Sequence, residues 1–598
     1  MNTTHAPTTT TSGPLLQPRL HRGRRHLTWL AIFAATVALF YLEENWRGHR
    51  DWENCKRELE AKGAKIDWSN FIPPPVPEDQ NIFGVPEMQK WFTGRGPTEL
   101  SKKLDLIGTD LATNSARMVV ARLTIGLPGT TPPAGSIVLS WADTNNAKAQ
   151  TALLIRQALG PLAMDPSGFD LMAKKPEEVR PAQIFLQCQT VPTRTNLLQL
   201  RPESVAPLGI LYETGINWEK VNLEATGNNS YQVTMYAPIR AADYVAWMEK
   251  FEPDLAVVRQ ALQRPYSRMG GDYSYPPEIP IPNFVTIRAV AQRLSGLARC
   301  YLMLGQPEKA LDQLTFMHQL CVMLEARPSG KLMTLVQAMS NVAVTGLYVE
   351  TIQDGLRLQV WQEPQLTALQ EQLKEIHLRP YIRDAFALEG IGGCNTVEMT
   401  PLAEMGNIFN MGEWSHSGKT RPHPKFSFPF SVIPRGWYYQ NMVVVAELHQ
   451  MWMDDSGLTS ASELVEPHTL ATFAPALERK LSHWSPFNIL AAISIPNFSR
   501  AMQTYSHNQT LANQAQIVCA LERYHLARGE YPATLEELTP RFIEKIPADL
   551  IGGQPPHYHR TADGKFLLYS IGWTEKDHGG QSGSKVSEGD WVWGDGLD

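Results

Sequence analysis

The stretch Leu27-Thr-Trp-Leu-Ala-Ile-Phe-Ala-Ala-Thr-Val-Ala-Leu-Phe-Tyr-Leu42 decides the architecture, because none of its side chains carries a charge. As a helix it is about 24 Å long, against a bilayer hydrocarbon core of about 30 Å. Trp29 lies near one end, and Tyr41 and Trp46 lie near the other. Aromatic rings favour the two membrane interfaces and so extend the span. The sequence predicts a single transmembrane helix at residues 27–46.

The charges that flank this run predict its orientation. The tail 1–26 has four arginines and no acid, whereas Glu43 and Glu44 follow the run. Positive flanks stay on the cytoplasmic side, so we expect everything after about residue 46 outside the cytoplasm. The alternative is a cleaved signal peptide, but no small-x-small site closes the run. We therefore expect an uncleaved, single-pass protein of the inner membrane.

The remaining composition is that of a globular chain with several domains. Its 598 residues are 43% hydrophobic and 19% charged, with a formal charge of −6 and no basic block, which argues against a nucleic-acid partner. The six cysteines include no C-x-x-C pair, which argues against a zinc ribbon or a disulfide scaffold. No dinucleotide-binding, P-loop or nucleophile-elbow motif is present. Catalysis therefore has no motif to support it.

Residues 47–99 read as a juxtamembrane helix followed by a spacer. Apolar residues recur at helical spacing over 46–66, which predicts a charged helix that lifts the body off the bilayer. The proline-rich segment 71–81 cannot form a helix or a central strand. It is either an extended spacer or a strap packed on the body, and a ligand for aromatic grooves is the weaker alternative.

Residues 100–245 predict a small α/β module. The expected strands are Met118–Ile125, Ile137–Trp141, Ile184–Gln187 and Tyr231–Tyr236, with a helix at Ala147–Leu159.

Residues 246–485 predict a helical body. Asn283 caps a helix that ends at Gly305, and Pro307 starts its antiparallel partner. This hairpin, at about 284–328, resembles one tetratricopeptide unit, but no second copy follows. Further helices are expected at Leu332–Val349, Gln365–Ile376 and Tyr438–Met453, with buried thiols at Cys300, Cys321 and Cys519 and an irregular excursion over Gly390–Arg435.

Three groups of polar residues are candidate binding or catalytic sites. Arginines and tyrosines gather in the loop Arg264–Tyr275, where they either bind a sugar or a carboxylate or pin the loop to the body. His557 and His559 share one face of a strand and could bind zinc with His578, but no carboxylate or cysteine completes the set. Glu447 and His449 lack the second histidine of a zincin and are interpreted as surface or core groups.

The tail, residues 486–598, has the clearest local signals. A long helix stops at Gly529, and Tyr531-Pro532 follows. Thr534 and Glu537 form a capping box, Asp563-Gly564 predicts the turn of a hairpin, and Trp591–Trp593 predicts a last short strand.

This order of elements resembles the major pseudopilin of type II secretion systems. The resemblance covers about the last 110 residues, and its carriers are Gly529, Tyr531, Pro532, Leu535, Leu538, Pro547, Asp549, Tyr558, Asp563, Gly564, Tyr569, Ser570, Gly572, Gly579, Gly580, Asp590 and Trp593. Pseudopilins begin with a peptidase site directly before their membrane helix. The anchor at Leu27 has no such site and lies far upstream, so this chain is not expected to be processed or polymerised as a pilin.

The resemblance also implies a calcium-binding loop at the end of the chain. Asp577, Glu588 and Asp590 are the residues it would use, with Glu575 as a fourth acid nearby. Calcium requires six to eight oxygen ligands. This loop has Glu-Lys-Asp-His where the family tends to have Asp-Gly, so the alternative is a solvated polar loop without a metal.

Together these features predict an α+β, predominantly helical protein with a single anchor, a small α/β module (100–245), a helical body (246–485) and a pseudopilin-like domain (486–598). The preferred function is a membrane-anchored envelope protein that acts through protein contacts, related to secretion by the resemblance of its tail. The alternative is an exported hydrolase or glycan-binding protein that uses the α/β module and the loop Arg264–Tyr275.

Overall fold

The structure is a computed structural model of residues 1–598. It describes residues 20–105, 117–126, 131, 137–140, 183–188, 222–227, 230–236, 241–326, 334–405, 432–460, 462–481, 485–488 and 498–594. Within these ranges the protein is predominantly helical, as the sequence predicts, with one apolar helix near the N-terminus and a small antiparallel sheet near the C-terminus. The structural statements below refer to this part of the chain.

The helices are α1 (Leu20–Ala61), α2 (Pro86–Phe92), α3 (Glu99–Asp105), α8 (Ala241–Met248), α9 (Glu252–Ala261), α10 (Phe284–Met303), α11 (Pro307–Leu324), α12 (Leu335–Arg357), α13 (Glu363–Lys374), α14 (Arg379–Met399), α16 (Arg435–Asp455), α17 (Pro467–Leu481) and α19 (Phe498–Arg528). The strands are β1 (Arg117–Gly126), β2 (Ile137–Ser140), β3 (Gln183–Cys188), β4 (Asn222–Gly227), β5 (Ser230–Tyr236), β6 (His557–Arg560), β7 (Phe566–Ser570) and β8 (Trp591–Val592).

The chain divides into two compact units. Unit 1 contains residues 1–66, 397–447 and 481–495, and unit 2 contains residues 67–396, 448–480 and 496–598. The predicted tail range 486–598 is therefore shared between the two units.

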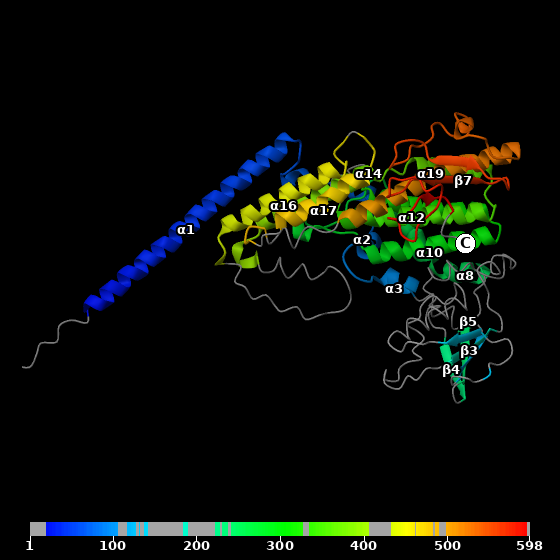
Figure 1. Ribbon diagram of the computed structural model, residues 1–598, viewed down its shortest axis with the longest axis horizontal. Helices are drawn as coiled ribbons and strands as arrows, with labels where there is room; N and C mark the ends of the chain where they lie inside the picture. The colour runs from blue at the N-terminus through cyan, green and yellow to red at the C-terminus, as the bar shows by residue number, and fades with distance from the viewer. Residues whose placement is uncertain are drawn as a thin grey trace, which may run out of the picture. The chain divides into compact units, whose positions relative to one another are not determined.

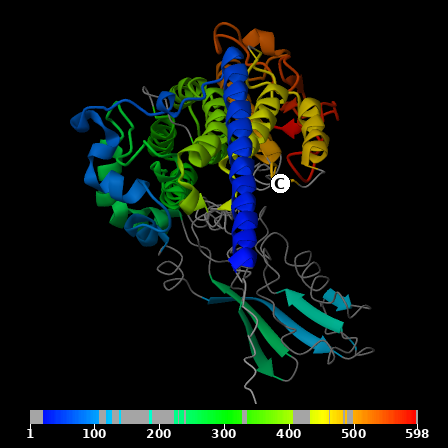
Figure 2. The same cartoon turned by 90° about the vertical axis from the view of Figure 1, so that its left-hand side faces the viewer.

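Unit 1 is built on α1, which Figures 1 and 2 show as one unbroken helix. Beyond the apolar run, α1 contacts the start of α16. A Cβ atom on Gly48 would lie 2.1 Å from the carbonyl oxygen of Gly436, so the two backbones touch where the helices cross. Further along, Trp52 is fully buried and its indole N–H donates to Glu398. This part of α1 is thus packed inside unit 1, whereas the sequence predicted a helix that lifts the body off the bilayer.

Helices α10, α11 and α12 form the centre of unit 2. The Asn283 side chain accepts the backbone N–H of Thr286, as its predicted role as a cap requires, and Gly305 closes α10 with a φ of +67°. Pro307 starts α11. Helix α12 contacts both α10 and α19 (Figure 1). The predicted helical hairpin is confirmed in both its helices and its turn.

The five strands β1–β5 form one sheet in the order β2-β3-β1-β5-β4. All their pairings are antiparallel, with an irregular register between Val119 and Ala121 of β1. The four predicted strands are present, and β4 was missed because Asn222–Gly227 has little β-branched or aromatic character. The predicted helix Ala147–Leu159 lies outside the described residues.

The tail forms a helix followed by a small sheet. Strands β6, β7 and β8 pair antiparallel in this order, with the predicted turn at Gly564, whose φ is +82°. The capping box of Thr534 and Glu537 is present. One buried cluster joins α19 to the sheet: Ile517, Val518, Ala520, Leu521, Leu535, Leu538, Phe542, Ile543 and Leu568. On its other side α19 packs against α12 and α13, so the helix is buried within unit 2.

The prediction of an irregular excursion over Gly390–Arg435 is wrong at its start. Helix α14 continues through Gly390, Gly392 and Gly393 to Met399. Gly390 is needed in this helix because a Cβ there would lie 2.3 Å from the imidazole of His449. Gly390 thus serves close packing here rather than chain reversal, and residues 406–431 lie outside the described part.

Candidate functional site

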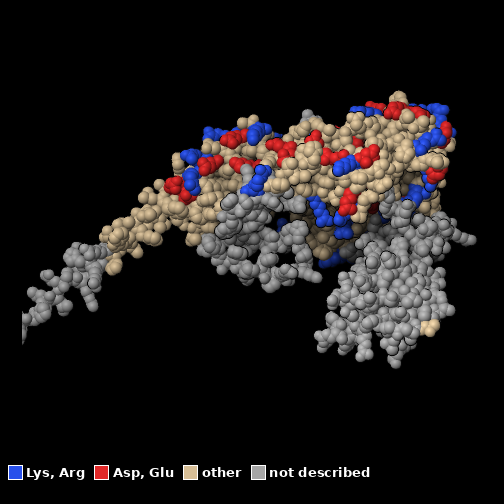
Figure 3. All heavy atoms as spheres, viewed as in Figure 1, with Lys and Arg blue, Asp and Glu red and all other residues tan. Residues whose placement is uncertain are grey.

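Most of the exposed large apolar side chains of the described residues lie in the apolar run of α1. Its large side chains are 38–70% exposed: Leu27, Trp29, Leu30, Ile32, Phe33, Val37, Leu39, Phe40 and Leu42. In Figure 3 the described part of this helix shows no charged side chain before it reaches the body. The helix is long and apolar enough to cross a membrane, and none of its apolar window is buried by the protein.

The motifs of the tail meet one another in the fold. The Asp549 carboxylate accepts a hydrogen bond of 2.8 Å from the Ser570 hydroxyl and one from the backbone N–H of Ile551. Burial raises the pKa of Asp549, and these donors oppose that shift. Ser570 also accepts the N–H of Gly572. Hydrogen bonds among Asp549, Ser570 and Gly572 therefore hold one turn-rich corner together.

The residues from Gly529 to Pro532 close the end of α19. Tyr531 stacks on His525 at 4.5 Å, meets the ring of Phe566 edge-on, and donates its hydroxyl to Glu522 at 2.8 Å. Tyr558 donates to the carbonyl of Pro532. Burial raises the pKa of Glu522 and of Tyr531. These side chains fix how α19 meets the sheet, which is a structural role.

The acids proposed for calcium lie in the final loop, but their oxygens already accept other donors. Asp590 is fully buried and accepts the backbone N–H groups of His578 and Gly580. Asp577 accepts from Gly579, which lowers the pKa of Asp577, and from Tyr569.

Glu588 faces a different turn and accepts from Ser584 and Lys585, which lower its pKa. Glu575 pairs with His468. Amide N–H groups and cations thus already bind these carboxylates within the protein, which leaves fewer oxygens for a cation that requires six to eight of them.

Two of the three histidines proposed for zinc are also engaged elsewhere, and His559 is exposed on β6. His557 stacks on Tyr569 at 4.8 Å, and the Nδ1 atom of His578 lies 3.3 Å from Asp590. Among the described residues, no group of three or more His, Cys, Asp or Glu side chains is placed to hold a metal ion.

Calcium is therefore expected to leave the thermal stability of the full-length protein unchanged. A ligand that binds only the folded state raises the melting temperature, and the occupied carboxylates offer no such site. Melting curves in detergent with millimolar calcium and with a chelator should coincide, and equal concentrations of magnesium serve as the control for ionic strength. A higher melting temperature in calcium alone would contradict this prediction.

The loop Arg264–Tyr275 packs against the proline-rich segment. Asn81 donates to the carbonyl of Arg268 at 2.8 Å and accepts the N–H of Arg268 at 2.9 Å. Arg264 donates to the carbonyl of Asn81, and the N–H of Ile82 donates to Tyr266. The segment 71–81 is thus a strap on the body rather than a free spacer.

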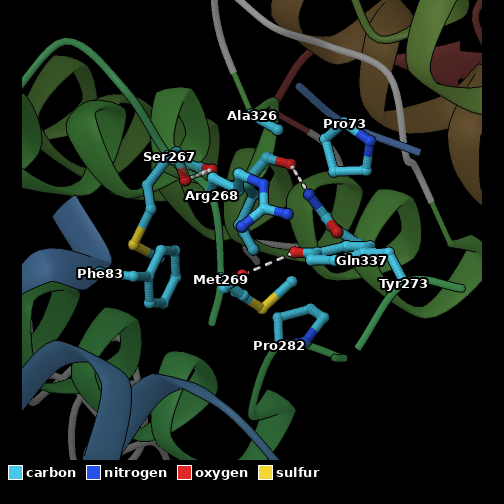
Figure 4. A pocket seen from close by; sticks show the side chains of 11 residues that line it. Pro73, Phe83, Ser267, Arg268, Met269, Tyr273, Pro282, Ala326 and Gln337 are labelled. Atoms are coloured by element: carbon cyan, nitrogen blue, oxygen red, sulfur yellow. Dashed lines mark hydrogen bonds between the residues drawn. The ribbon is translucent and has the colours of Figure 1, made fainter. Parts of the chain in front are cut away.

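A small pocket lies beneath this strap (Figure 4). Pro73, Phe83 and Met269 line it, and the guanidinium of Arg268 lies over the ring of Tyr273 at 4.7 Å. Its volume is about 20 Å³, which is room for one water molecule. Ser267, Arg268 and Tyr273 are among the polar residues that line it, and no acid or histidine does.

A larger groove of about 610 Å³ lies between α8–α9 and α10–α11, and sequence reasoning missed it. Arg259 binds Glu252 at 2.6 Å and lies over the ring of Phe316. Lys309 lies over Tyr301, whose pKa is raised by burial and then by nearby acids. The groove mixes paired charges with apolar walls. The amphipathic spacing of α10 and α11 predicts which of their faces pack in the core, but not that a groove opens beside them.

The imidazole of His449 lies inside the protein, since its Nε2 atom is buried, although the residue as a whole is half-buried; this fits the core role, one of the two proposed for it. Burial lowers the pKa of His449 to about 4, opposed by a hydrogen bond to the backbone of Phe386. The predicted thiols Cys300, Cys321 and Cys519 are also buried. Burial raises the pKa of Cys321 and of Cys519 to about 12, which disfavours the reactive thiolate.

Replacing His449 by glutamine should reduce the pH dependence of stability. Between pH 6.5 and about 4 the unfolded chain binds a proton that the folded chain excludes, so the free energy of unfolding falls as pH drops through this window. The shift corresponds to about 3 kcal/mol.

The variant should therefore lose about 3 kcal/mol less than the parent when denaturant unfolding is compared at neutral pH and below pH 4. Equal losses for the two chains would contradict a buried neutral imidazole.

No family model, curated protein or solved structure matches the chain.

Proposed function

We propose that the protein is a single-pass, inner-membrane-anchored protein of a bacterial envelope, with its bulk on the extracytoplasmic side. The observation that carries the proposal is the apolar run of α1, whose large side chains are mostly exposed and whose apolar window is not buried by the protein. A surface of this kind is costly in water and is covered by lipid in an anchored protein. The arginines before the run and the acids after it support the orientation.

The body acts through protein contacts. In support, the large groove between α8–α9 and α10–α11 is open and lined by charged and apolar side chains. The groove between α8–α9 and α10–α11 offers carboxylates, cations and apolar walls to an extended segment of a partner protein.

The tail is a pseudopilin-like domain that serves type II secretion without polymerising. Its order of a long helix, the Tyr531-Pro532 turn and three antiparallel strands supports the resemblance. Helix α19 is buried against α12 and α13, and this burial supports a fixed subunit rather than one that assembles through the same helix.

A secretion assay in the native host tests this function. Deleting the gene should reduce the amount of exported protein in the medium by several-fold, and the full-length chain supplied in trans should restore it. A chain in which Arg259 and Lys309 are both replaced by glutamate should restore membrane levels of the protein but not secretion, because the charges of the groove are reversed. Normal secretion in the deletion strain would contradict the proposal.

A further inference from the structure

A second segment of chain touches α1 where its apolar run ends. The ring of Phe40 meets the ring of Trp437 edge-on at 6.3 Å, and the Tyr41 hydroxyl donates to the carbonyl of Val432. Trp437 in turn meets Phe487 at 5.4 Å. We call these five residues the aromatic collar. All of them belong to unit 1, so their mutual placement is set within one compact body.

The crossing of two helices fixes the depth of the collar along α1. Gly48 and Gly436 bring the two backbones into contact, and a Cβ on Gly436 would overlap the carbonyl oxygen of Glu44. The side chain of Asn45 accepts the N–H of Gly436 at 2.9 Å. Because these contacts leave no room for sliding, the first turn of α16 stays beside the last turns of the apolar run.

Of the two acids that follow the run, Glu44 does not force the collar into water. Glu44 is 7% exposed, and its Oε2 atom accepts the indole N–H of Trp437 and the guanidinium of Arg47, each at 2.8 Å. Arg47 lies over the ring of Phe487 at 5.8 Å. The charge of Glu44 is thus paired inside the protein, whereas that of Glu43 is exposed. The collar itself consists of rings and the 55% exposed Val432.

The length of the run also places the collar at the membrane boundary. Leu27–Leu42 spans about 24 Å as a helix and falls about 6 Å short of a typical hydrocarbon core. Phe40 and Tyr41 lie within its last turn, so Val432 and Trp437 lie at the same depth. Tyrosine and tryptophan at this depth are stabilised by the interface between headgroups and acyl chains.

We propose that the aromatic collar inserts into the headgroup region of the bilayer, so that unit 1 rests on the membrane surface beside its anchor. The occupant of this surface is lipid, because the collar is continuous with the lipid-facing surface of α1. The inference rests on the proposed anchor and adds a second membrane contact from a segment about 390 residues later in the chain.

Depth-dependent quenching tests the collar with the full-length protein. Single cysteines replace Val432, Ala35 in the middle of the run, or Glu58 farther along α1, and each carries an environment-sensitive fluorophore. The proteins are reconstituted into phosphatidylcholine–phosphatidylglycerol vesicles with a quencher attached near the headgroup or near the end of the acyl chain. The described native cysteines are buried, and the unsubstituted chain labelled in parallel gives the background.

The collar predicts that the label at position 432 is quenched at least about twofold more by the shallow quencher than by the deep one, as expected at the interface. Position 35 should show the opposite preference. Position 58 should be quenched by neither, because it lies about 24 Å beyond the run along the helix.

An unquenched label at position 432, with position 35 still quenched, would overturn the collar and leave the anchor intact. An unquenched label at position 35 would overturn the anchor itself. A blue shift of the fluorophore emission at position 432 without quenching would mean that protein rather than lipid covers this surface, and it would also overturn the proposal.

Discussion

Replacing both Ala34 and Ala35 by arginine is expected to release the protein from the membrane. Both positions lie near the middle of the apolar run and are exposed. An arginine at the centre of a spanning helix costs about 2.5–3.5 kcal/mol on insertion scales, so the pair costs about 5–7 kcal/mol. Most of the variant chain should leave the membrane pellet in an alkaline carbonate wash, whereas the parent should stay.

The matched control places leucine at the same two positions. Leucine adds similar bulk without charge, so this chain should remain in the pellet like the parent. If the arginine pair stays in the pellet to the same extent as the leucine pair, another part of the chain holds the protein to the membrane.

Replacing Phe386 by alanine should give the largest loss of stability within the body. The ring is fully buried and meets Phe498 at 4.8 Å and Trp452 at 5.9 Å. Deleting a buried phenyl ring leaves a cavity and costs about 3–5 kcal/mol. Denaturant unfolding followed by tryptophan fluorescence should detect this loss, because Trp452 lies beside the cavity.

The same substitution at Phe284 provides the control. This ring is 44% exposed at the start of α10, so its loss should cost less than about 1 kcal/mol. Equal effects at the two positions would mean that Phe386 is not packed in a buried aromatic cluster.

Local signals in the sequence were sufficient for the helical hairpin and for the hairpin of the tail. Asn283 and Gly305 mark the ends of one helix, and Asp563-Gly564 marks a turn, because each of these residues acts through its own backbone or its nearest neighbours. The long apolar helix near the N-terminus was equally predictable, since sixteen consecutive uncharged residues need no partner to be recognised.

Contacts between distant segments could not be predicted in this way. Gly48 and Gly436 read as weak points of helices, and only the fold shows that each makes room for the other's backbone. The loop acids are a similar case. The sequence shows that Asp577 and Asp590 are close in the chain, but not that amide N–H groups already occupy their oxygens.

The position of the C-terminus relative to the membrane tests the central claim most directly. Two reporters can each be fused after Asp598. Alkaline phosphatase becomes active only outside the cytoplasm, and a fluorescent protein becomes fluorescent only inside it. The account predicts an active phosphatase and a dark fluorescent protein, at matched levels of the two fusions. A fluorescent fusion together with an inactive phosphatase would contradict it.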